Sequence, residues 1–392
     1  MRIKKIGWII ALLLLATAVY AQSVSRATYR VIQEAQALAE EDKYAEARTI
    51  LEALISEITD DPYDFAIVSQ SLAHACAMLD DLGCARSSLE AALATPDVPP
   101  EMLTDMSLFY GTVLLSEEEY ELARDVLETW LANAHIVQSV HIFATGYANY
   151  MADDIDRAET LIAMAIDKSD APKESWYELY YRVLFEQKKF DQAESVQLGL
   201  ISRNPGKQQH WRTLASHYMQ IDRQNEALAA IMIGHHQGLI DNDRDLQQIV
   251  SLYGYVDVPE KGARMLQDWI NEDRLPEDAA TLTQLGSMWL LARERDSAKV
   301  VLEKAATLAE DGKSYRMLGG IYFEDEDWLD AYGAYQKAIS KGGLDEPHQV
   351  MLLAGISAMR AGSKDDAKRA LTAALESDEL RPQAERLLGQ ID

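Results

Sequence analysis

Cysteine is scarce in this chain, which has only Cys76 and Cys84 in 392 residues. With so few, the sequence contains no cysteine–histidine arrangement typical of a catalytic thiol or a metal site. No cysteine follows the N-terminal apolar run, which argues against a lipoprotein tether. The pair itself leaves two alternatives open: a disulfide, which an oxidising compartment would allow, or two buried thiols.

Basic residues are also few, because 37 Lys and Arg stand against 64 Asp and Glu, giving a net charge of -27. Such a surface repels nucleic-acid phosphates and anionic membrane headgroups, so both are excluded as partners. It favours solubility and the basic segments of protein partners. An acidic disordered chain is excluded by the 48% apolar content and the seven tryptophans.

Catalytic and cofactor motifs are missing as well. The stretch "GLISRNPGKQ" (199–208) has a Gly-Lys pair, but the spacing and the absent hydroxyl do not fit a phosphate-binding loop. The stretch "DNDRDLQQIVSL" (241–252) begins like a calcium loop, but leucine occupies both the glycine-turn and the bidentate-acid positions. His235 and His236 are adjacent on a helix and cannot both face one metal. We therefore predict that the protein is not an enzyme and has no cofactor or metal.

Long apolar runs are limited to one, from Ile6 to Val19, which follows a cationic start. Its 14 residues are too few to span a membrane, which takes about 20. Val19 and Ala21 match a secretory cleavage site before Gln22. We predict that residues 1–21 are a cleaved signal peptide, that the mature chain is periplasmic, and that it has no integral membrane segment. The alternative is an uncleaved N-terminal anchor.

The rest of the chain is dominated by a repeat in which small residues recur at fixed intervals. A small residue marks the start of a second helix in every unit, and successive markers are 33 to 38 residues apart. The markers are Ala47, Ala85, Ala123, Ala158, Ala193, Ala227, Gly262, Ala298, Ala331 and Ala367. A helical period near 34 resembles the tetratricopeptide (TPR) repeat.

Two further positions support the repeat. Twelve residues before the marker, eight units carry Gly or Ala, and four residues after it nine units carry a large side chain. Close approach of two helices requires small residues at the contact, so we expect Gly319 and Ala331 to face each other. Nine of the ten prolines lie between units or in terminal segments, where they end one helix and can open the next.

The predicted fold class is all-α: a right-handed α-solenoid of about ten TPR-like helix-turn-helix repeats with a C-terminal capping helix. We expect residues 22–392 to form a single solenoid. The predicted repeats are approximately 28–65, 66–103, 104–138, 139–173, 174–207, 208–242, 243–278, 279–311, 312–347 and 348–380, with a cap at 381–392.

In such a stack the first helices line a concave groove, and their inward positions carry aromatic, arginine and methionine side chains of the kind that dominate binding interfaces. The predicted partner-binding residues are Phe143, Tyr147, Tyr150, Arg182, Phe185, Arg212, Met219, Tyr255, Arg316 and Phe323. Any one of them could instead pack against a neighbouring repeat. We expect the ligand to be a protein or peptide segment.

The second half of the chain carries a narrower resemblance. Residues Ala171 to Asp392 include "KESWYELYYRVLFEQKKFDQAE", "DVPEKGARMLQDWI" and "YRMLGGIYFEDEDWLDAYGAYQKAISKGGL". These stretches are similar to periplasmic TPR proteins encoded with TonB–ExbB–ExbD energy-transducing systems. The resemblance implies a non-catalytic scaffold with TonB-, ExbB- or ExbD-type partners. The alternative function is an adaptor or chaperone-like factor for assembly of the cell wall or outer membrane.

Overall fold

The computed structural model describes residues 24–58 and 61–391 of the chain. The predicted signal peptide, residues 1–21, lies outside the described residues. Across the described part the chain forms twenty-one α-helices and no strand. None of these helices is both long enough and apolar enough to cross a membrane.

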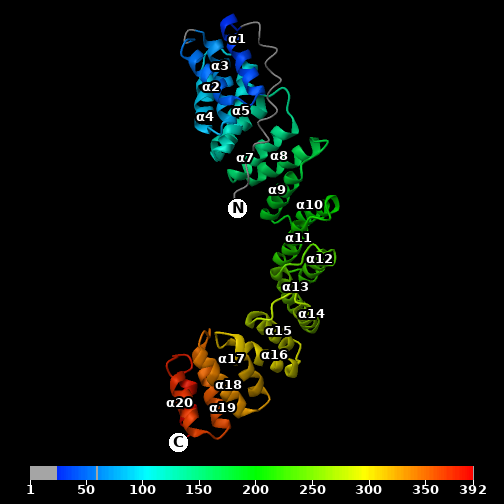
Figure 1. The fold of residues 1–392 in the computed structure, drawn as a ribbon, viewed down its shortest axis with the longest axis vertical. Helices are drawn as coiled ribbons and strands as arrows, with labels where there is room; N and C mark the ends of the chain where they lie inside the picture. The colour runs from blue at the N-terminus through cyan, green and yellow to red at the C-terminus, as the bar shows by residue number, and fades with distance from the viewer. Residues whose placement is uncertain (1–23, 59–60, 392) are drawn as a thin grey trace. The chain divides into compact units, whose positions relative to one another are not determined.

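The helices run in chain order with short connections (Figure 1). Their bounds are α1 (Arg26–Glu40), α2 (Tyr44–Ile55), α3 (Pro62–Met78), α4 (Leu82–Leu93), α5 (Pro100–Ser116), α6 (Tyr120–Asn133), α7 (Ser139–Met151), α8 (Ile155–Lys168), α9 (Glu174–Glu186), α10 (Phe190–Arg203), α11 (Gln208–Gln220), α12 (Gln224–His236), α13 (Asp243–Tyr255), α14 (Pro259–Asn271), α15 (Ala279–Leu291), α16 (Arg295–Leu308), α17 (Lys313–Glu324), α18 (Trp328–Lys341), α19 (Pro347–Arg360), α20 (Lys364–Ala374) and α21 (Arg381–Leu388).

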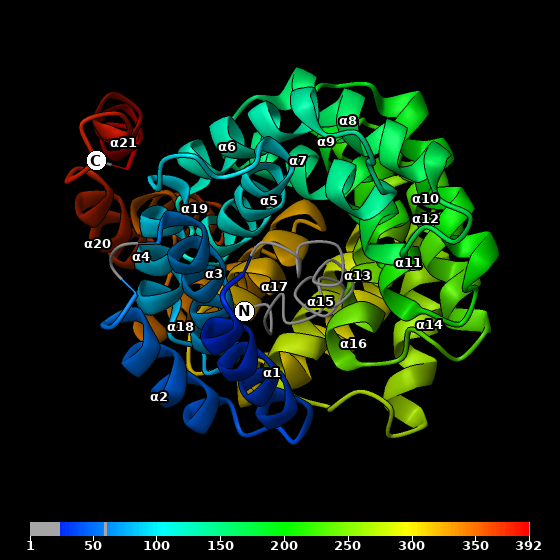
Figure 2. The same ribbon diagram turned by 90° about the horizontal axis from the view of Figure 1, so that it is seen from above.

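Three-residue turns connect these helices two by two, α1 with α2 through α19 with α20, and nine of these ten pairs pack into hairpins within a unit. Helix α10 crosses the boundary between the units, and α21 packs against α20 as the predicted cap. The all-α class and the helix-turn-helix repeats are therefore confirmed. The chain divides into two compact units, Met1–Leu200 and Ile201–Asp392, and each is described by itself. Within each unit, successive hairpins follow one another in chain order (Figure 2). That residues 22–392 form a single solenoid stays a prediction.

Every hairpin turn has the same backbone geometry. Three residues separate the two helices, and the middle one has a positive φ, between 57° and 83°. Aspartate tolerates this left-handed conformation better than most side chains, because its short polar group bonds locally. The ten middle residues are Asp42, Asp80, Glu118, Asp153, Lys188, Asp222, Asp257, Arg293, Glu326 and Gly362. Each lies five residues before its repeat marker, so the turn is part of the repeat.

The small residues of the first helices make room for large residues of the second. A Cβ atom built on Gly319 would lie 2.6 Å from ring atoms of Tyr335, and one on Gly111 would lie 2.5 Å from Leu127. Gly319 thus faces the ring of Tyr335, four residues after Ala331 on α18, and that it faces Ala331 itself stays a prediction. A large side chain on one helix fills the space that the glycine leaves on the other.

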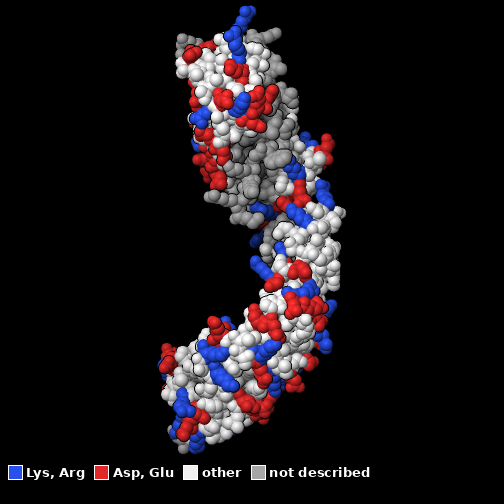
Figure 3. All heavy atoms as spheres, viewed as in Figure 1, with Lys and Arg blue, Asp and Glu red and all other residues white. Residues whose placement is uncertain are grey.

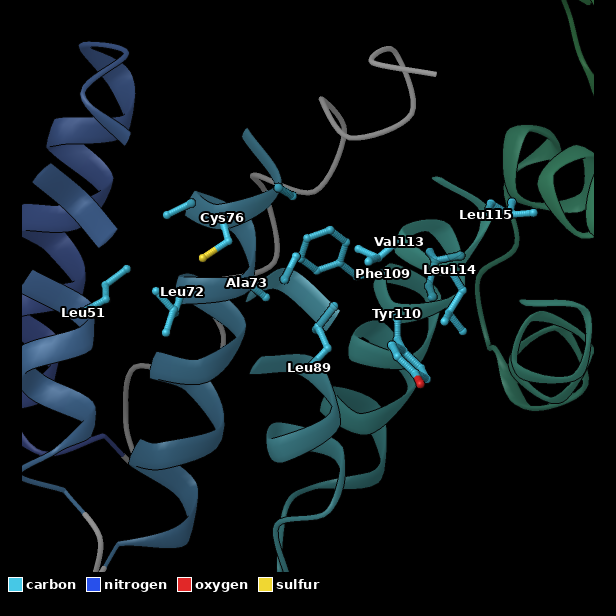
Figure 4. Close-up of a cluster of buried hydrophobic side chains, with 14 of the residues drawn as sticks. Leu51, Leu72, Ala73, Cys76, Leu89, Phe109, Tyr110, Val113, Leu114 and Leu115 are labelled. Atoms are coloured by element: carbon cyan, nitrogen blue, oxygen red, sulfur yellow. The ribbon is translucent and has the colours of Figure 1, made fainter. Parts of the chain in front are cut away.

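Buried apolar side chains fill the spaces between successive helices. In the first unit, Leu51 of α2, Leu72 of α3, Leu89 of α4 and Phe109 of α5 belong to one cluster, each at most 7% exposed (Figure 4). A core of this kind extends from hairpin to hairpin, so each hairpin is stabilised by its neighbours.

Four first helices begin earlier than the predicted repeat boundaries, α1 and α19 by one or two residues and α3 and α5 by four. Helix α3 begins at Pro62 and α5 at Pro100, four residues before the predicted starts at 66 and 104. Both have proline at the first helical position, where the missing N–H costs nothing. At α3, Asp61 also caps the helix, because its side chain accepts hydrogen bonds from the N–H groups of Tyr63 and Asp64.

Candidate functional site

Three of the predicted groove residues in the first unit brace neighbouring hairpins. The ring of Phe143 on α7 stacks on that of Trp176 on α9, with centroids 4.7 Å apart and planes 10° apart. The hydroxyl of Tyr150 donates a hydrogen bond to Oε1 of Glu186, at 2.7 Å. Tyr147 packs against the cluster that includes Leu179 and Val183 of α9, and burial raises the pKa of its hydroxyl. These contacts join α7 to α9 within the unit, so part of the predicted surface holds the repeats together.

The other two predicted residues of this unit lie on α9. Arg182 is exposed, and its positive charge acts on the hydroxyls of Tyr147 and Tyr150, opposing the rise in pKa that burial causes. Phe185 is half-buried and contacts the ring of Phe190 edge to face, with centroids 5.2 Å apart. Arg182 is thus the exposed member of this group.

In the second unit, Arg212 is not free to bind a ligand. Its Nη2 donates to Oδ2 of Asp245 on α13, whose side chain is only 6% exposed. The stretch "DNDRDLQ", which begins like a calcium loop in the sequence, forms the start of helix α13. Asn242 caps this helix, and Asp245 is paired with Arg212. Met219 packs against the core, and Phe323 contacts Trp328 edge to face at 5.3 Å. Tyr255, by contrast, is 71% exposed.

Arg316 lines a hollow of about 1070 Å³ in the second unit. The hollow lies over α17, between the end of α15 and the side chain of Leu353 on α19. The lining residues are Leu290, Arg293, Glu294, Arg295, Asp296, Arg316, Met317, Gly320, Ile321, Glu324, Asp325, Tyr335 and Leu353. We call the apolar and glycine lining residues (Leu290, Met317, Gly320, Ile321, Tyr335 and Leu353) the floor of the hollow and its charged lining residues the walls.

Some of the charged side chains that line the hollow form ion pairs, and others do not. Arg295 pairs with Glu324 at 2.5 Å and with Asp325 at 3.1 Å, and Lys299 also binds Asp325 at 2.6 Å. The "EDED" segment thus joins two hairpins. Among the described residues, the guanidinium groups of Arg293 and Arg316 make no ion pair. These two cations remain available to an anionic group.

The floor of the hollow is open above Gly320. A Cβ atom built there would meet no atom within 4 Å, whereas one on the adjacent Gly319 would clash with Tyr335. Tyr335 itself is 2% exposed, and burial raises the pKa of its hydroxyl to about 12. Its ring is therefore part of the apolar floor. A side chain at position 320 would enter the hollow without disturbing the packing beneath it.

Cys76 and Cys84 are bonded to each other, with their Cα atoms 5.8 Å apart. The adjacent histidines have different surroundings. Nδ1 of His235 is 2.7 Å from the carbonyl oxygen of Ile240, while His236 is exposed. His235 also contacts the ring of Trp269 edge to face. Its role is to hold the end of its own helix and the residues that follow.

The sequence pointed to Arg316 but missed Arg293 and Gly320. Arg293 occupies the middle of a hairpin turn, five residues before the marker Ala298, where most units carry an acidic residue. That departure from the acidic pattern was a detectable signal. Gly320 had none, because its open space depends on how the neighbouring side chains pack.

Comparison with known proteins finds similarity of fold and no match in sequence. No family model matches the sequence, and no curated protein matches it. The C-terminal part of a TPR repeat-containing protein from Cytophaga hutchinsonii is 12% identical, with a TM-score of 0.47 over 62% of this chain and 98% of that chain. MamA from Desulfovibrio magneticus RS-1 is 18% identical, with a TM-score of 0.40 over 46% and 96%.

A third solved structure is YrrB, described as a TPR protein with an unusual peptide-binding site. It is 17% identical, with a TM-score of 0.39 over 46% of this chain and 88% of that chain. At this level of likeness, the assignment depends on the chain's own helices. With helix-turn-helix repeats, three-residue turns and a capping helix, the described part of the chain is built of tetratricopeptide-type repeats in both units.

Proposed function

We propose that this chain is a non-catalytic scaffold that binds a protein segment in the hollow of its second unit. The observation that carries the proposal is the pair of arginines, Arg293 and Arg316, which have no ion-pair partner among the described residues and stand over an apolar floor. Arginine and apolar surface together are the usual components of a binding hot spot.

The chemistry of the hollow defines the segment it would accept. Leu290, Met317 and Leu353 offer contact to apolar side chains, and the two arginines offer hydrogen bonds to carboxylates or backbone carbonyls. Elsewhere on the second unit, basic side chains are interspersed with acidic ones (Figure 3). The net charge of -27 would attract basic stretches of the same partner and speed its encounter.

We further propose that the scaffold is exported to the periplasm and acts as an accessory component of a TonB-type energy-transducing system. Support comes from the signal-peptide pattern of residues 1–21 and from the resemblance of Ala171–Asp392 to TPR proteins encoded with such systems. The bonded cysteines are consistent with an oxidising compartment. A TonB- or ExbD-type protein would then supply the segment.

The test uses substitution at Gly320, where a side chain has room. Gly320→Leu places a four-carbon side chain in the hollow, and Gly320→Ala is the matched control that adds only one carbon. Each variant of residues 22–392 would be titrated with the purified periplasmic domains of the TonB and ExbD proteins of the same cells. We expect Gly320→Leu to weaken binding at least about tenfold, as loss of a hot spot does, and Gly320→Ala to keep it.

Equal affinity of both variants for a bound domain would remove the hollow from the function. If neither the TonB domain nor the ExbD domain binds, the TonB assignment is wrong. Cross-linking in intact cells, repeated with Gly320→Leu, then tests whether the hollow binds another partner. A wall-synthesis enzyme or an outer-membrane precursor, lost in the variant, would favour the adaptor in envelope assembly.

A further inference from the structure

The disulfide of the second hairpin joins two sulfur atoms in different surroundings. Cys76 lies in the last turn of α3 and is 0% exposed, among Leu51 and Leu72 of the first unit's core (Figure 4). Cys84 is the third residue of α4 and is half-buried. Cys84 also packs against this core, but it is the residue of the pair that solution reaches, whereas Cys76 is covered.

The electrostatic surroundings of the two sulfur atoms also differ, and carboxylates near Cys84 offset part of the effect of its helix terminus. The start of α4 favours an anion, because its free N–H groups and the helix dipole point there. Asp81 caps this end, because its side chain accepts a hydrogen bond from the backbone N–H of Cys84 at 3.1 Å, and Arg48 pairs with Asp81 at 2.9 Å. Arg48 also binds Glu52 at 2.6 Å, so the nearby charges are one cation and two carboxylates. Burial among leucines, by contrast, disfavours a thiolate at Cys76.

We propose that Cys84 is the entry sulfur of this disulfide, the one that exchanges with an external disulfide oxidant, and that Cys76 is the resolving sulfur. The Cys84 thiolate attacks one sulfur of the oxidant's disulfide, which forms a mixed disulfide and releases one oxidant thiolate. The Cys76 thiolate then attacks the Sγ atom of Cys84 and displaces the second oxidant thiolate. The chain loses two electrons and two protons, and the oxidant gains them as a dithiol.

The geometry of the hairpin makes the second step intramolecular. The cysteines are eight residues apart, and the turn between their helices is fixed by Asp80 with a φ of 62°. Because the folded hairpin holds the two Cα atoms 5.8 Å apart, folding itself brings Cys76 to the mixed disulfide. Reduction follows the same path in reverse, with an external thiolate attacking Cys84 and Cys76 leaving.

The test is the order in which the two thiols react in the folded protein. The chain of residues 22–392 would be reduced, freed of reductant and treated briefly with iodoacetamide, and the two modified peptides would be quantified by mass spectrometry. We expect Cys84 to be alkylated at least about tenfold faster than Cys76, and the two to react alike in denaturant. Equal rates in the folded protein, or faster reaction of Cys76, would overturn the proposal.

Two single variants test the mixed disulfide with oxidised glutathione as the probe. Cys76→Ala keeps the entry sulfur and should gain one glutathione under native conditions, while Cys84→Ala should gain almost none. Thermal melts of both variants establish that each is folded when it is treated. A folded Cys84→Ala protein that gains glutathione as fast as Cys76→Ala would contradict the assignment. If either variant does not fold, the alkylation of the wild-type chain decides alone.

Discussion

Gly319 and Gly320 are adjacent on α17 but have opposite surroundings. The side of the helix at Gly319 is filled by the ring of Tyr335, whereas no atom lies within 4 Å of a Cβ built on Gly320. The first glycine is therefore required by packing between two helices, and the second by nothing in its own hairpin. Because both have ordinary helical backbone, their substitution separates packing from helix propensity.

We predict opposite effects of alanine at these two positions. Gly319→Ala places a carbon 2.6 Å from the Tyr335 ring, so it should lower the free energy of unfolding by roughly 1–3 kcal/mol through overpacking. Gly320→Ala should raise it by up to about 1 kcal/mol, since alanine has the higher helix propensity. Thermal and urea melts of the two variants measure both. A Gly319→Ala protein as stable as the parent would show that the Tyr335 ring can move away from the added carbon without loss of stability.

The left-handed turn residues give a second prediction at this scale. Lys188 has a φ of 60°, a conformation that costs a non-glycine residue about 1 kcal/mol, while Gly362 adopts it at φ 83° in the equivalent turn. Lys188→Gly should therefore stabilise the protein by roughly 0.5–1 kcal/mol, and Gly362→Ala should destabilise it by a similar amount. Urea titrations of the pair are the measurement. Destabilisation by both changes would mean that Lys188 makes contacts worth more than its strain.

At the scale of helices, ion pairs connect one hairpin to the next. Arg157 on α8 binds Glu128 on α6 through two hydrogen bonds, each of 2.8 Å, and Lys189 binds Glu159 at 2.5 Å. Asn149 also donates to Glu128 at 2.9 Å. The Arg157 guanidinium, and to a lesser degree Asn149, hold the pKa of Glu128 below its usual value. Such pairs fix the orientation of neighbouring hairpins more than they add stability.

The depressed pKa of Glu128 predicts a loss of stability in acid. A carboxyl group whose pKa is lower when folded stabilises the protein above its unfolded pKa, near 4.5, and loses this effect as the pH falls through the folded value. Because the Glu128 side chain is 28% exposed, we expect a contribution of roughly 1 kcal/mol or less. Urea melts of wild type and Glu128→Gln should differ at pH 7 and converge below pH 4.5. A difference that persists unchanged to low pH would assign the effect to something other than ionisation.

The repeat architecture was predictable from the sequence, and the site was predictable only in part. Marker residues such as Ala331 lie where two helices approach closely, and this depends on local spacing. The all-α class, the helix-turn-helix repeats and the cap are therefore confirmed. The role of a groove side chain depends on which partner its rotamer reaches. Arg212 meets Asp245, and Phe143 meets Trp176, both from the next hairpin, while Arg316 meets an open hollow. No pattern within one repeat distinguishes these outcomes.

At the scale of the whole chain, acidic residues outnumber basic ones by 64 to 37. The ion pairs use the basic residues, as Arg48, Arg157 and Arg295 illustrate, so many carboxylates remain without a nearby cation. Repulsion among them opposes the compact state. Salt would weaken both the ion pairs and this repulsion, and the excess of acidic residues determines which effect dominates.

We therefore predict that moderate salt stabilises this protein. The Debye length falls from about 30 Å at 0.01 M to about 8 Å at 0.15 M, which screens carboxylates on neighbouring hairpins more than ion pairs at 2.5–3 Å. A gain of about 1 kcal/mol would raise the melting temperature by roughly 2–4 °C for units of this size. Thermal melts in 10 mM and 150 mM sodium chloride measure it, and sucrose of equal osmolarity is the uncharged control. A melting temperature that falls with sodium chloride would show that the ion pairs between hairpins outweigh the repulsion of the whole chain.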